Sequence, residues 1–234
     1  MNEVQKQRDY YENHATCYDE MCAFNKCDEH YFATAALRGL TELYEIESVL
    51  DVGCGTGRSL SYLREHCANL KLSGVEPVDA LRAQCLEKGF SAEQIRIGSA
   101  DSLEMPDNSA DCVTMFGVLH HVPNPAAAID EAFRVASKMV LISDHNIYGM
   151  GNPVTKLAKQ SFRALGLRRV LAKIMTRGKG FHDTDWDGIF YPFSILDHFA
   201  QMRSRSKHIY SMSTKTPATN LLTQASHVAL ISVL

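Results

Sequence analysis

VLDVGCGTGRSL, Val49 to Leu60, begins as a short apolar run and passes through Asp51 into three alternating glycines. An apolar run of this kind predicts a buried parallel strand. Gly53, Gly55 and Gly57 predict a turn whose backbone can approach a ligand closely, because glycine has no Cβ. The helix that follows would direct its free N–H groups to the same place. The stretch therefore predicts a strand-to-helix turn that binds a nucleoside.

The spacing of the glycines distinguishes between nucleoside cofactors. A dinucleotide-binding turn has the form G-x-G-x-x-G, but Arg58 stands where its third glycine would be. The form DVGCGTG instead resembles the first motif of the class I S-adenosylmethionine-dependent methyltransferases, in the type 11-like, small-molecule group. The resemblance implies an α/β fold, with a doubly wound, Rossmann-like, seven-stranded, mostly parallel sheet and an antiparallel last strand. It also implies S-adenosyl-L-methionine as cofactor and S-adenosyl-L-homocysteine as product.

The ends of three later apolar runs fit the same resemblance. Glu76 ends the second run and, by the resemblance, accepts from both ribose hydroxyls, with Pro77 along the adenine. Asp101 follows the third run, at the family position whose carboxylate accepts from the adenine amino group. The fourth run ends where the family closes over the methionine part of the cofactor. The implied cofactor-binding residues in these segments are Asp51, Gly53, Cys54, Gly55, Gly57, Glu76, Pro77, Ala100, Asp101, Ser102, Phe116 and Gly117.

The N-terminal segment YENHATCYD, residues 11–19, carries a further likeness. It resembles the Y-x-x-x-A-x-x-Y-D segment that many small-molecule methyltransferases fold over the cofactor. The resemblance implies that Tyr11 and Tyr18 bind the cofactor, with His14 beside them. A helix that packs on the domain through the same residues is the alternative, and both interpretations stay open.

The apolar runs and helical patterns alternate along the chain, which is typical of a doubly wound parallel sheet. We expect a helical N-terminus to about residue 43, and strands at 49–52, 70–75, 95–98, 111–116 and 139–144. Helices are expected at 58–67, 78–88 and 125–137, and closing strands at 207–213 and 227–234. We predict a single methyltransferase domain with an N-terminal helical lid (1–45), a cofactor-binding core (46–145), an acceptor-binding insertion (146–206) and closing strands (207–234).

Composition agrees with one cytoplasmic domain. The chain has 234 residues, 45% of them hydrophobic, and a net charge of −3, which gives no general attraction to nucleic acid. The N-terminus has no apolar core, and no apolar run is long enough for a membrane span. The seven cysteines are an odd number and form no C-x-x-C pair, so we expect reduced thiols. The sequence leaves the oligomeric state open.

A metal site is not expected from the cysteines. Cys17, Cys22, Cys27 and His30 lie close together in sequence. The four-residue gaps between the cysteines do not fit the usual spacing of tetrahedral zinc ligands. We therefore predict that these residues pack or lie on the surface, and that the protein binds no metal.

Histidines supply the candidate base. The segment that begins at Gly117, GVLH, lacks the N/D-P-P-Y sequence of methyltransferases that act on base or amide nitrogens. Methyl transfer from a sulfonium mainly requires that the nucleophile is aligned and loses its proton. A histidine with a pKa near 6.5 can deprotonate a hydroxyl. We hypothesise that His121 or His145 is the base and Asp144 its orienting partner; the alternative is that these histidines lie on the surface or cap helices.

The predicted insertion has two unusual segments. Residues 146–181 contain eight Lys or Arg and no Asp or Glu, and apolar residues alternate with the cations. The part 156–179 is typical of contact with an anionic membrane or a phosphorylated acceptor, or of a solvated helix face. Residues 181–192 combine three aspartates with Trp186 and Tyr191, which suits a sugar or another hydroxylated ligand.

These observations predict an enzyme that transfers a methyl group from S-adenosylmethionine to a small-molecule acceptor. The favoured acceptor is a hydroxyl of a saccharide-like molecule or secondary metabolite, phosphorylated or glycan-like. C- or N-methylation of a small metabolite is one alternative. A cofactor-binding regulatory partner without turnover is another, and Arg58 disfavours a nucleotide-dependent oxidoreductase.

Overall fold

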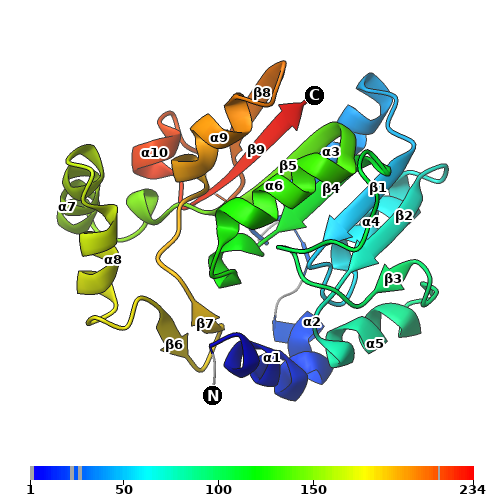
Figure 1. Ribbon diagram of the computed structural model, residues 1–234, viewed down its shortest axis with the longest axis horizontal. Coiled ribbons are helices and arrows are strands. Elements are labelled where there is room, and N and C mark those ends of the chain that lie inside the picture. Colours follow the sequence, from blue (N-terminus) through cyan, green and yellow to red (C-terminus); the bar gives the residue numbers. More distant parts are fainter. Residues whose placement is uncertain (1–2, 22–23, 26–27, 216) are drawn as a thin grey trace.

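A seven-stranded sheet forms the body of the protein in the computed structural model, which describes residues 3–21, 24–25, 28–215 and 217–234. The strand order is β3-β2-β1-β4-β5-β9-β8 (Figure 1). β9 runs antiparallel to both of its neighbours, β5 and β8, and the other pairs are parallel. The predicted fold class is confirmed. The strands are β1 (Ser48–Val52), β2 (Lys71–Val75), β3 (Ile95–Arg96), β4 (Ala110–Phe116), β5 (Ala136–His145), β8 (His208–Ser213) and β9 (His227–Val233).

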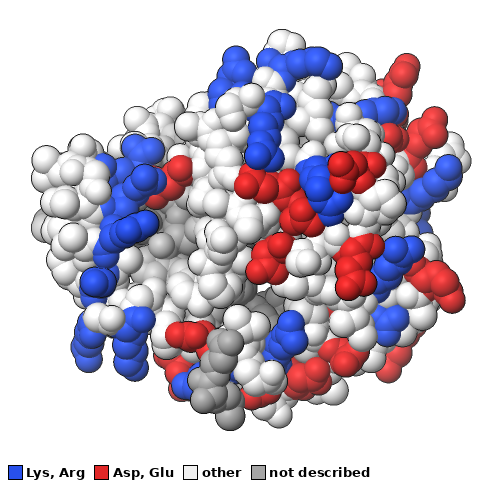
Figure 2. All heavy atoms as spheres, in the orientation of Figure 1, with Lys and Arg blue, Asp and Glu red and all other residues white. Residues whose placement is uncertain are grey.

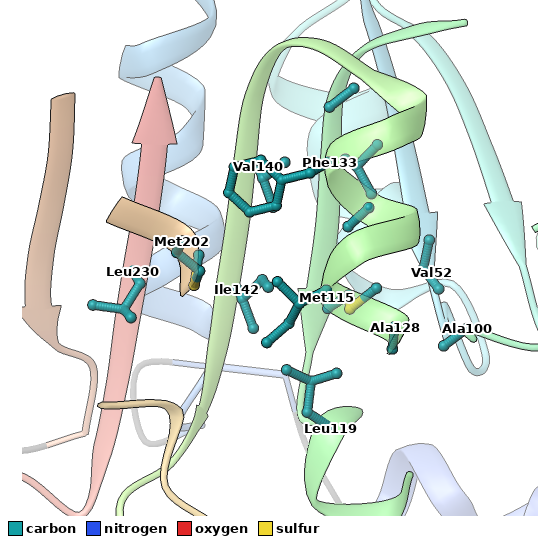
Figure 3. Packing of buried hydrophobic residues seen from close by; sticks show 14 of the residues in the cluster. Val52, Ala100, Met115, Leu119, Ala128, Phe133, Val140, Ile142, Met202 and Leu230 are labelled. Atoms are coloured by element: carbon teal, nitrogen blue, oxygen red, sulfur yellow. The ribbon is translucent and has the colours of Figure 1, made fainter. Parts of the chain in front are cut away.

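Helices cover both faces of the sheet (Figure 1). On one face, α3 (Tyr31–Leu43), α4 (Arg58–His66) and α5 (Asp79–Glu87) pack through one buried apolar cluster. On the other face, α6 (Pro125–Val135) and α9 (Phe199–Arg203) pack on a second cluster (Figure 3). Burial of these apolar side chains supplies the main force that holds the helices to the sheet.

The turn after β1 requires two of its glycines. Gly53 has φ +70°, and a Cβ there would lie 2.6 Å from Val118 Cγ2. Gly57 has φ +75° at the N-cap of α4, and its Cβ would collide with the sulfur of Cys85. At both positions a residue with a Cβ would adopt an unfavourable backbone conformation and would also clash with its neighbours. The turn is thereby fixed against the helices on one side and the end of β4 on the other.

The N-terminal segment lies across the end of the sheet at which β1, β2 and β4 terminate (Figure 1). It comprises α1 (Glu3–His14), the 3-10 turn η1 (Ala15–Cys17) and α2 (Tyr18–Met21). Ala15 packs with Val78 and Leu81 at the start of α5. Two of the four residues in the predicted Cys17–His30 group, Cys22 and Cys27, lie outside the described residues.

The chain between β5 and β8 leaves the sheet and returns (Figure 1). Its helices α7 (Pro153–Ala164) and α8 (Arg168–Met175) are followed by a hairpin of β6 (His182–Thr184) and β7 (Gly188–Phe190), in which Asp183 pairs with Ile189. The sequence patterns did not predict this hairpin. The shorter elements are η2 (Leu119–His121), η3 (Ile147–Gly149), η4 (Ile195–His198) and α10 (Leu221–Gln224).

Two predicted boundaries are wrong. β3 covers two residues rather than 95–98, because its partner β2 ends at Val75, the residue that pairs with Arg96. α6 ends at Val135 and β5 begins at Ala136, so residues 136–137 are strand rather than helix. Across the described residues, no helix combines the length and the apolar character that a membrane crossing needs.

Candidate active site

A cavity of about 230 Å³ lies where the parallel strands end. Ligands of open α/β sheets bind at this edge. The turn after β1, the end of β2 and the turn after β4 form its floor, and α1 closes it from above. The lining residues are Val4, Gln7, Arg8, Tyr11, Tyr18, Gly53, Gly55, Glu76, Pro77, Val78, Leu81, Ser99, Ala100, Asp101, Phe116, Gly117, Val118, His121, Val122 and Pro123.

Glu76 is the buried carboxylate of this cavity. Its Oε2 accepts from the backbone N–H of Gly55 at 2.8 Å, and its Oε1 accepts from that of Val78 at 3.0 Å. Burial raises the pKa of Glu76 to about 7, although these two N–H donors oppose the shift. A Cβ built on Gly55 would meet open space, so the backbone of the turn is accessible from the cavity. The floor thus offers a carboxylate and bare backbone to a ligand.

The structure brings together ten of the fourteen predicted cofactor residues. The remaining four predicted residues lie outside the lining of the cavity. Asp51 is buried and accepts from Thr114 Oγ1 at 2.8 Å, and Cys54 lies beneath the turn against Gly74. Gly57 caps α4, and Ser102 follows the lining residue Asp101. The ten in the lining are Tyr11, Tyr18, Gly53, Gly55, Glu76, Pro77, Ala100, Asp101, Phe116 and Gly117.

Several lining residues were missed from the sequence. Val4, Gln7 and Arg8 reach the cavity from α1. This helix is mostly polar, so its sequence gave no sign of the face it turns inward. Leu81, which lies on the apolar face of α5, also reaches the cavity. The described lining residues all fall between Val4 and Pro123, so the insertion 146–206 lies behind this wall rather than in it.

His121 lies in the wall of the cavity, with both ring nitrogens engaged. Its Nδ1 lies 2.6 Å from the carbonyl oxygen of Ile189, and its Nε2 lies 3.0 Å from the hydroxyl of Tyr11. Nδ1 also lies 3.0 Å from the amide nitrogen of Gln7, and Nε2 lies 3.5 Å from Asp187 Oδ1. Burial, followed by the charge of His120, lowers the pKa of His121. This shift favours the neutral form of the ring.

Asp144 orients His120, not the two histidines for which it was predicted. Its Oδ1 accepts from His120 Nδ1 at 2.7 Å, and its Oδ2 accepts from the N–H of Leu119 at 2.8 Å. Burial disfavours charge on His120, but the carboxylates of Asp144 and Asp187 outweigh it and raise its pKa to about 10. Although burial opposes the charge of Asp144, His120 holds its pKa below the usual range. The predicted partnership is wrong because the end of β5 faces the first histidine of η2.

His145 lies beside His120, outside the lining of the cavity. Its ring stacks on that of His120 with centroids 3.9 Å apart, and burial lowers its pKa to about 2. Of the two histidines proposed as the base, His121 is the one in the cavity lining.

The aspartates of residues 181–192 do not converge on one ligand site as predicted. Asp183 pairs with Lys6 of α1 at 3.3 Å, whereas Asp187 faces the rings of His120 and His121. Trp186 is 66% exposed. Asp183 lies on β6, whereas Trp186 and Asp187 lie in the turn between β6 and β7, so the hairpin directs these side chains to different surroundings.

A comparison with known protein families bears on this site. The family described as a methyltransferase domain matches residues 50–141. That span runs from β1 to β5 and includes the glycine turn, Glu76 and His121. Over residues 50–141 this match agrees with a class I, S-adenosylmethionine-dependent methyltransferase domain. The first-motif resemblance is confirmed. The floor of the cavity lies within the matched span, whereas the lining residues of the N-terminal segment precede it.

Individual relatives agree with the methyltransferase domain. The chain is 29% identical over 140 residues to a ubiquinone biosynthesis O-methyltransferase of Photobacterium profundum, which covers 58% of this chain and 55% of that protein. The chain spans about half the length of the curated relatives it matches. A methyltransferase of Thermotoga maritima has a similar fold, with a TM-score of 0.61, 16% identity and coverage of 97% and 99% of the two chains. The magnesium protoporphyrin IX methyltransferase of Synechocystis PCC 6803, solved with S-adenosylhomocysteine, has a TM-score of 0.60, 15% identity and 97% coverage of both chains.

Proposed function

We propose that the protein transfers a methyl group from S-adenosylmethionine to a hydroxyl of a small molecule. The cavity floor fits such a cofactor, because Gly55 leaves backbone open to it and Glu76 can accept from a ribose. Asp101 and Ala100 line the same cavity and would hold the adenine end, and Tyr11 and Tyr18 the methionine end. The four predicted residues outside the lining, Asp51, Cys54, Gly57 and Ser102, would support the turn from behind. When bound, the cofactor supplies a methyl group activated by its positive sulfur.

The observation that carries the proposal is the state of His121. Burial favours its neutral form, Ile189 and Gln7 hold its Nδ1, and the residue lines the cofactor cavity. Such a group takes a proton from a hydroxyl that approaches the cavity. Burial also excludes the water that would compete for this position. His145, the other predicted base, stacks on the ring of His120 and would support it.

The names of the relatives support oxygen as the methylated atom. Ubiquinone biosynthesis O-methyltransferases match over the core of this chain. The acceptor we favour is a saccharide-like or secondary-metabolite hydroxyl, and a phosphorylated or glycan-like acceptor belongs to the same class. C- or N-methylation and a regulatory protein without turnover remain the alternatives.

A surface on α7 and α8 supports contact with an anionic membrane through residues 156–179. Leu157 and Leu165 are 66% and 72% exposed, and Ile174 is 60% exposed. Lys and Arg side chains gather on the same side of the molecule (Figure 2). Exposed apolar side chains beside cations are typical of helices that lie on a membrane surface.

Calorimetric titration with S-adenosylhomocysteine, with NAD as comparison, tests the cofactor. We expect micromolar binding of the first and none of the second. Transfer of a labelled methyl group to components of a cell extract then tests the reaction. His121→Ala should abolish single-turnover transfer while S-adenosylhomocysteine still binds, and His145→Ala should retain transfer. Cofactor binding without transfer to any fraction would favour the regulatory alternative.

A further inference from the structure

His120, His121 and Asp187 bring three potential metal ligands together beside the cavity, which His121 lines. The Nε2 atom of His120 lies 3.6 Å from Asp187 Oδ2, and that of His121 lies 3.5 Å from Asp187 Oδ1. One ligand atom from each residue falls within 4.8 Å of the other two. Bonds of about 2.1 Å at tetrahedral angles place ligand atoms about 3.4 Å apart. The two observed nitrogen–oxygen spacings, 3.6 and 3.5 Å, are close to this value.

The other nitrogen of each imidazole is already fixed. His120 Nδ1 lies 2.7 Å from Asp144 Oδ1, and His121 Nδ1 lies 2.6 Å from the carbonyl oxygen of Ile189. Histidines that bind metals almost always donate their second N–H to a carboxylate or a backbone carbonyl. Here both kinds of partner occur, and they direct the two Nε2 atoms to the same carboxylate.

We propose that His120, His121 and Asp187 bind one divalent transition-metal cation beside the cofactor cavity. Two imidazoles and a carboxylate favour Zn²⁺, Co²⁺ or Fe²⁺ over Mg²⁺ and Ca²⁺, which prefer oxygen ligands. Three protein ligands leave a coordination position open, as in catalytic rather than structural zinc sites. When the cation binds, the hydroxyl of Tyr11, 3.0 Å from His121 Nε2, would have to move away, and His120, whose raised pKa keeps its ring charged in the metal-free protein, would have to release its Nε2 proton.

This inference rests on the proposed methyl transfer and changes one detail of it. A cation at this position lowers the pKa of an acceptor hydroxyl that it binds, and the proton leaves to water. The oxygen then forms its bond to the methyl carbon as the carbon–sulfur bond breaks, and the sulfonium becomes a neutral thioether. In the metal-loaded protein His121 is a ligand, and the cation takes over its function of making the hydroxyl reactive.

Metal titration of the chelator-treated full chain tests the site. We expect one Zn²⁺ per chain by calorimetry, no comparable binding of Mg²⁺, and visible absorption from bound Co²⁺. Emission of Trp186, the single tryptophan and the neighbour of Asp187, should change in step with binding. Asp187→Asn and His121→Gln should each weaken Zn²⁺ binding at least about tenfold, and Asp144→Asn about 10–100-fold. His182→Ala, in the same hairpin, is the control and should bind Zn²⁺ as the unmodified protein does.

Zn²⁺ binding that stays equal in Asp187→Asn and His121→Gln, with melting curves that show both variants folded, would overturn the inference. S-adenosylhomocysteine is titrated separately in the presence of chelator. If it binds and Zn²⁺ does not, the metal site is wrong and the proposed function stands. If Zn²⁺ binds and S-adenosylhomocysteine does not, the metal site stands and the proposed function is wrong.

Discussion

At the scale of single residues, Glu76 shows how burial tunes a binding group. Its carboxylate is 3% exposed, and two backbone N–H groups donate to it. Burial raises its pKa to about 7; the charge of Asp51 adds to the shift, and that of Arg8 opposes it. Near neutral pH the side chain is thus divided between its acid and its carboxylate.

We predict that the affinity for S-adenosylhomocysteine rises with pH through this range. Ribose hydroxyls donate to the ionised form of Glu76, so protonation below pH 7 removes an acceptor. Binding should be about tenfold weaker at about pH 6 than at about pH 8, by linkage of proton and ligand. Calorimetry across this range measures the effect. Glu76→Gln should bind more weakly and lose the pH dependence, and an equal dependence in that variant would place the titrating group elsewhere.

The sequence identified the residues that lie next to each other in the chain. The glycine turn and Glu76 were predictable because a strand end and the turn after it are local features. The partners of the histidines were not, since Asp187 reaches His120 and His121 through a hairpin 66 residues later in the chain. The prediction of no metal considered the cysteines and His30, and the cluster found in the structure was invisible to spacing. Asp187 belongs to residues 181–192, for which the sequence predicted a binding site for a sugar or another hydroxylated ligand.

At the scale of elements, the N-terminal helix α1 is held by polar contacts. Gln7 is buried; its amide donates to the carbonyl of Asp187 at 3.1 Å and its Oε1 accepts from the N–H of Ile189. Lys6 pairs with Asp183 of the same hairpin. These contacts join α1 to the hairpin β6–β7. The helix that covers the cavity and the hairpin that holds His121 through Ile189 therefore form one unit.

We predict that Gln7→Ala loosens this unit and not the sheet. The variant leaves the N–H of Ile189 buried without its acceptor, which costs about 1–3 kcal/mol. Amide hydrogen exchange should become faster in α1 and in residues 182–190, while β1, β4 and β5 keep their protection. Gln5→Ala is the matched control, because Gln5 is exposed on the same helix and bonds only to Asp9 among the described contacts. Similar exchange in both variants would mean that Gln7 does not hold α1.

Elements with strong apolar patterns were predictable, and short ones were not. β1, β4 and β9 follow from their apolar runs, because they are buried almost throughout. β6 and β7 have three residues each and take their form from contact with α1. Their residues carry no alternation that a sequence could show. The lid interpretation of Tyr11 and Tyr18 stays a prediction, although both line the cavity.

At the scale of the whole molecule, the basic stretch is partly neutralised by the fold. Asp197 accepts from Arg163 at 3.0 Å and Arg168 at 3.3 Å, and Lys159 is buried with its Nζ on the carbonyl of Met150. The positive charges of these three side chains are therefore partly neutralised or buried, and they add little to the positive charge of the surface. Four exposed cations remain in the described part of α8 and the turn after it: Arg169, Lys173, Arg177 and Lys179.

We predict that changing Arg169, Lys173 and Lys179 to Glu abolishes binding to anionic vesicles. Each cation near such a surface contributes about 1 kcal/mol, so reversal of three should weaken binding at least about hundredfold. Vesicle co-sedimentation measures this with phosphatidylserine-rich and neutral lipids. Changing Arg38, Lys71 and Lys207, which are exposed on other elements, to Glu gives the same net charge and serves as control. An equal loss of vesicle binding in both variants would mean that only the overall charge matters. Unchanged binding in the first variant would mean that residues 156–179 form a solvated helix face.

β9 has a consequence for the order in which the protein is made. It lies between β5 and β8, pairs Val233 with Met139, and is buried at every position. On the ribosome, β1 to β5 emerge first, and β5 then has an open apolar edge until residues 227–233 follow. β8, although synthesised before β9, has no strand to join in that interval. The nascent chain thus carries an unfinished sheet through the synthesis of its last third, the stage at which we expect it to depend on a chaperone.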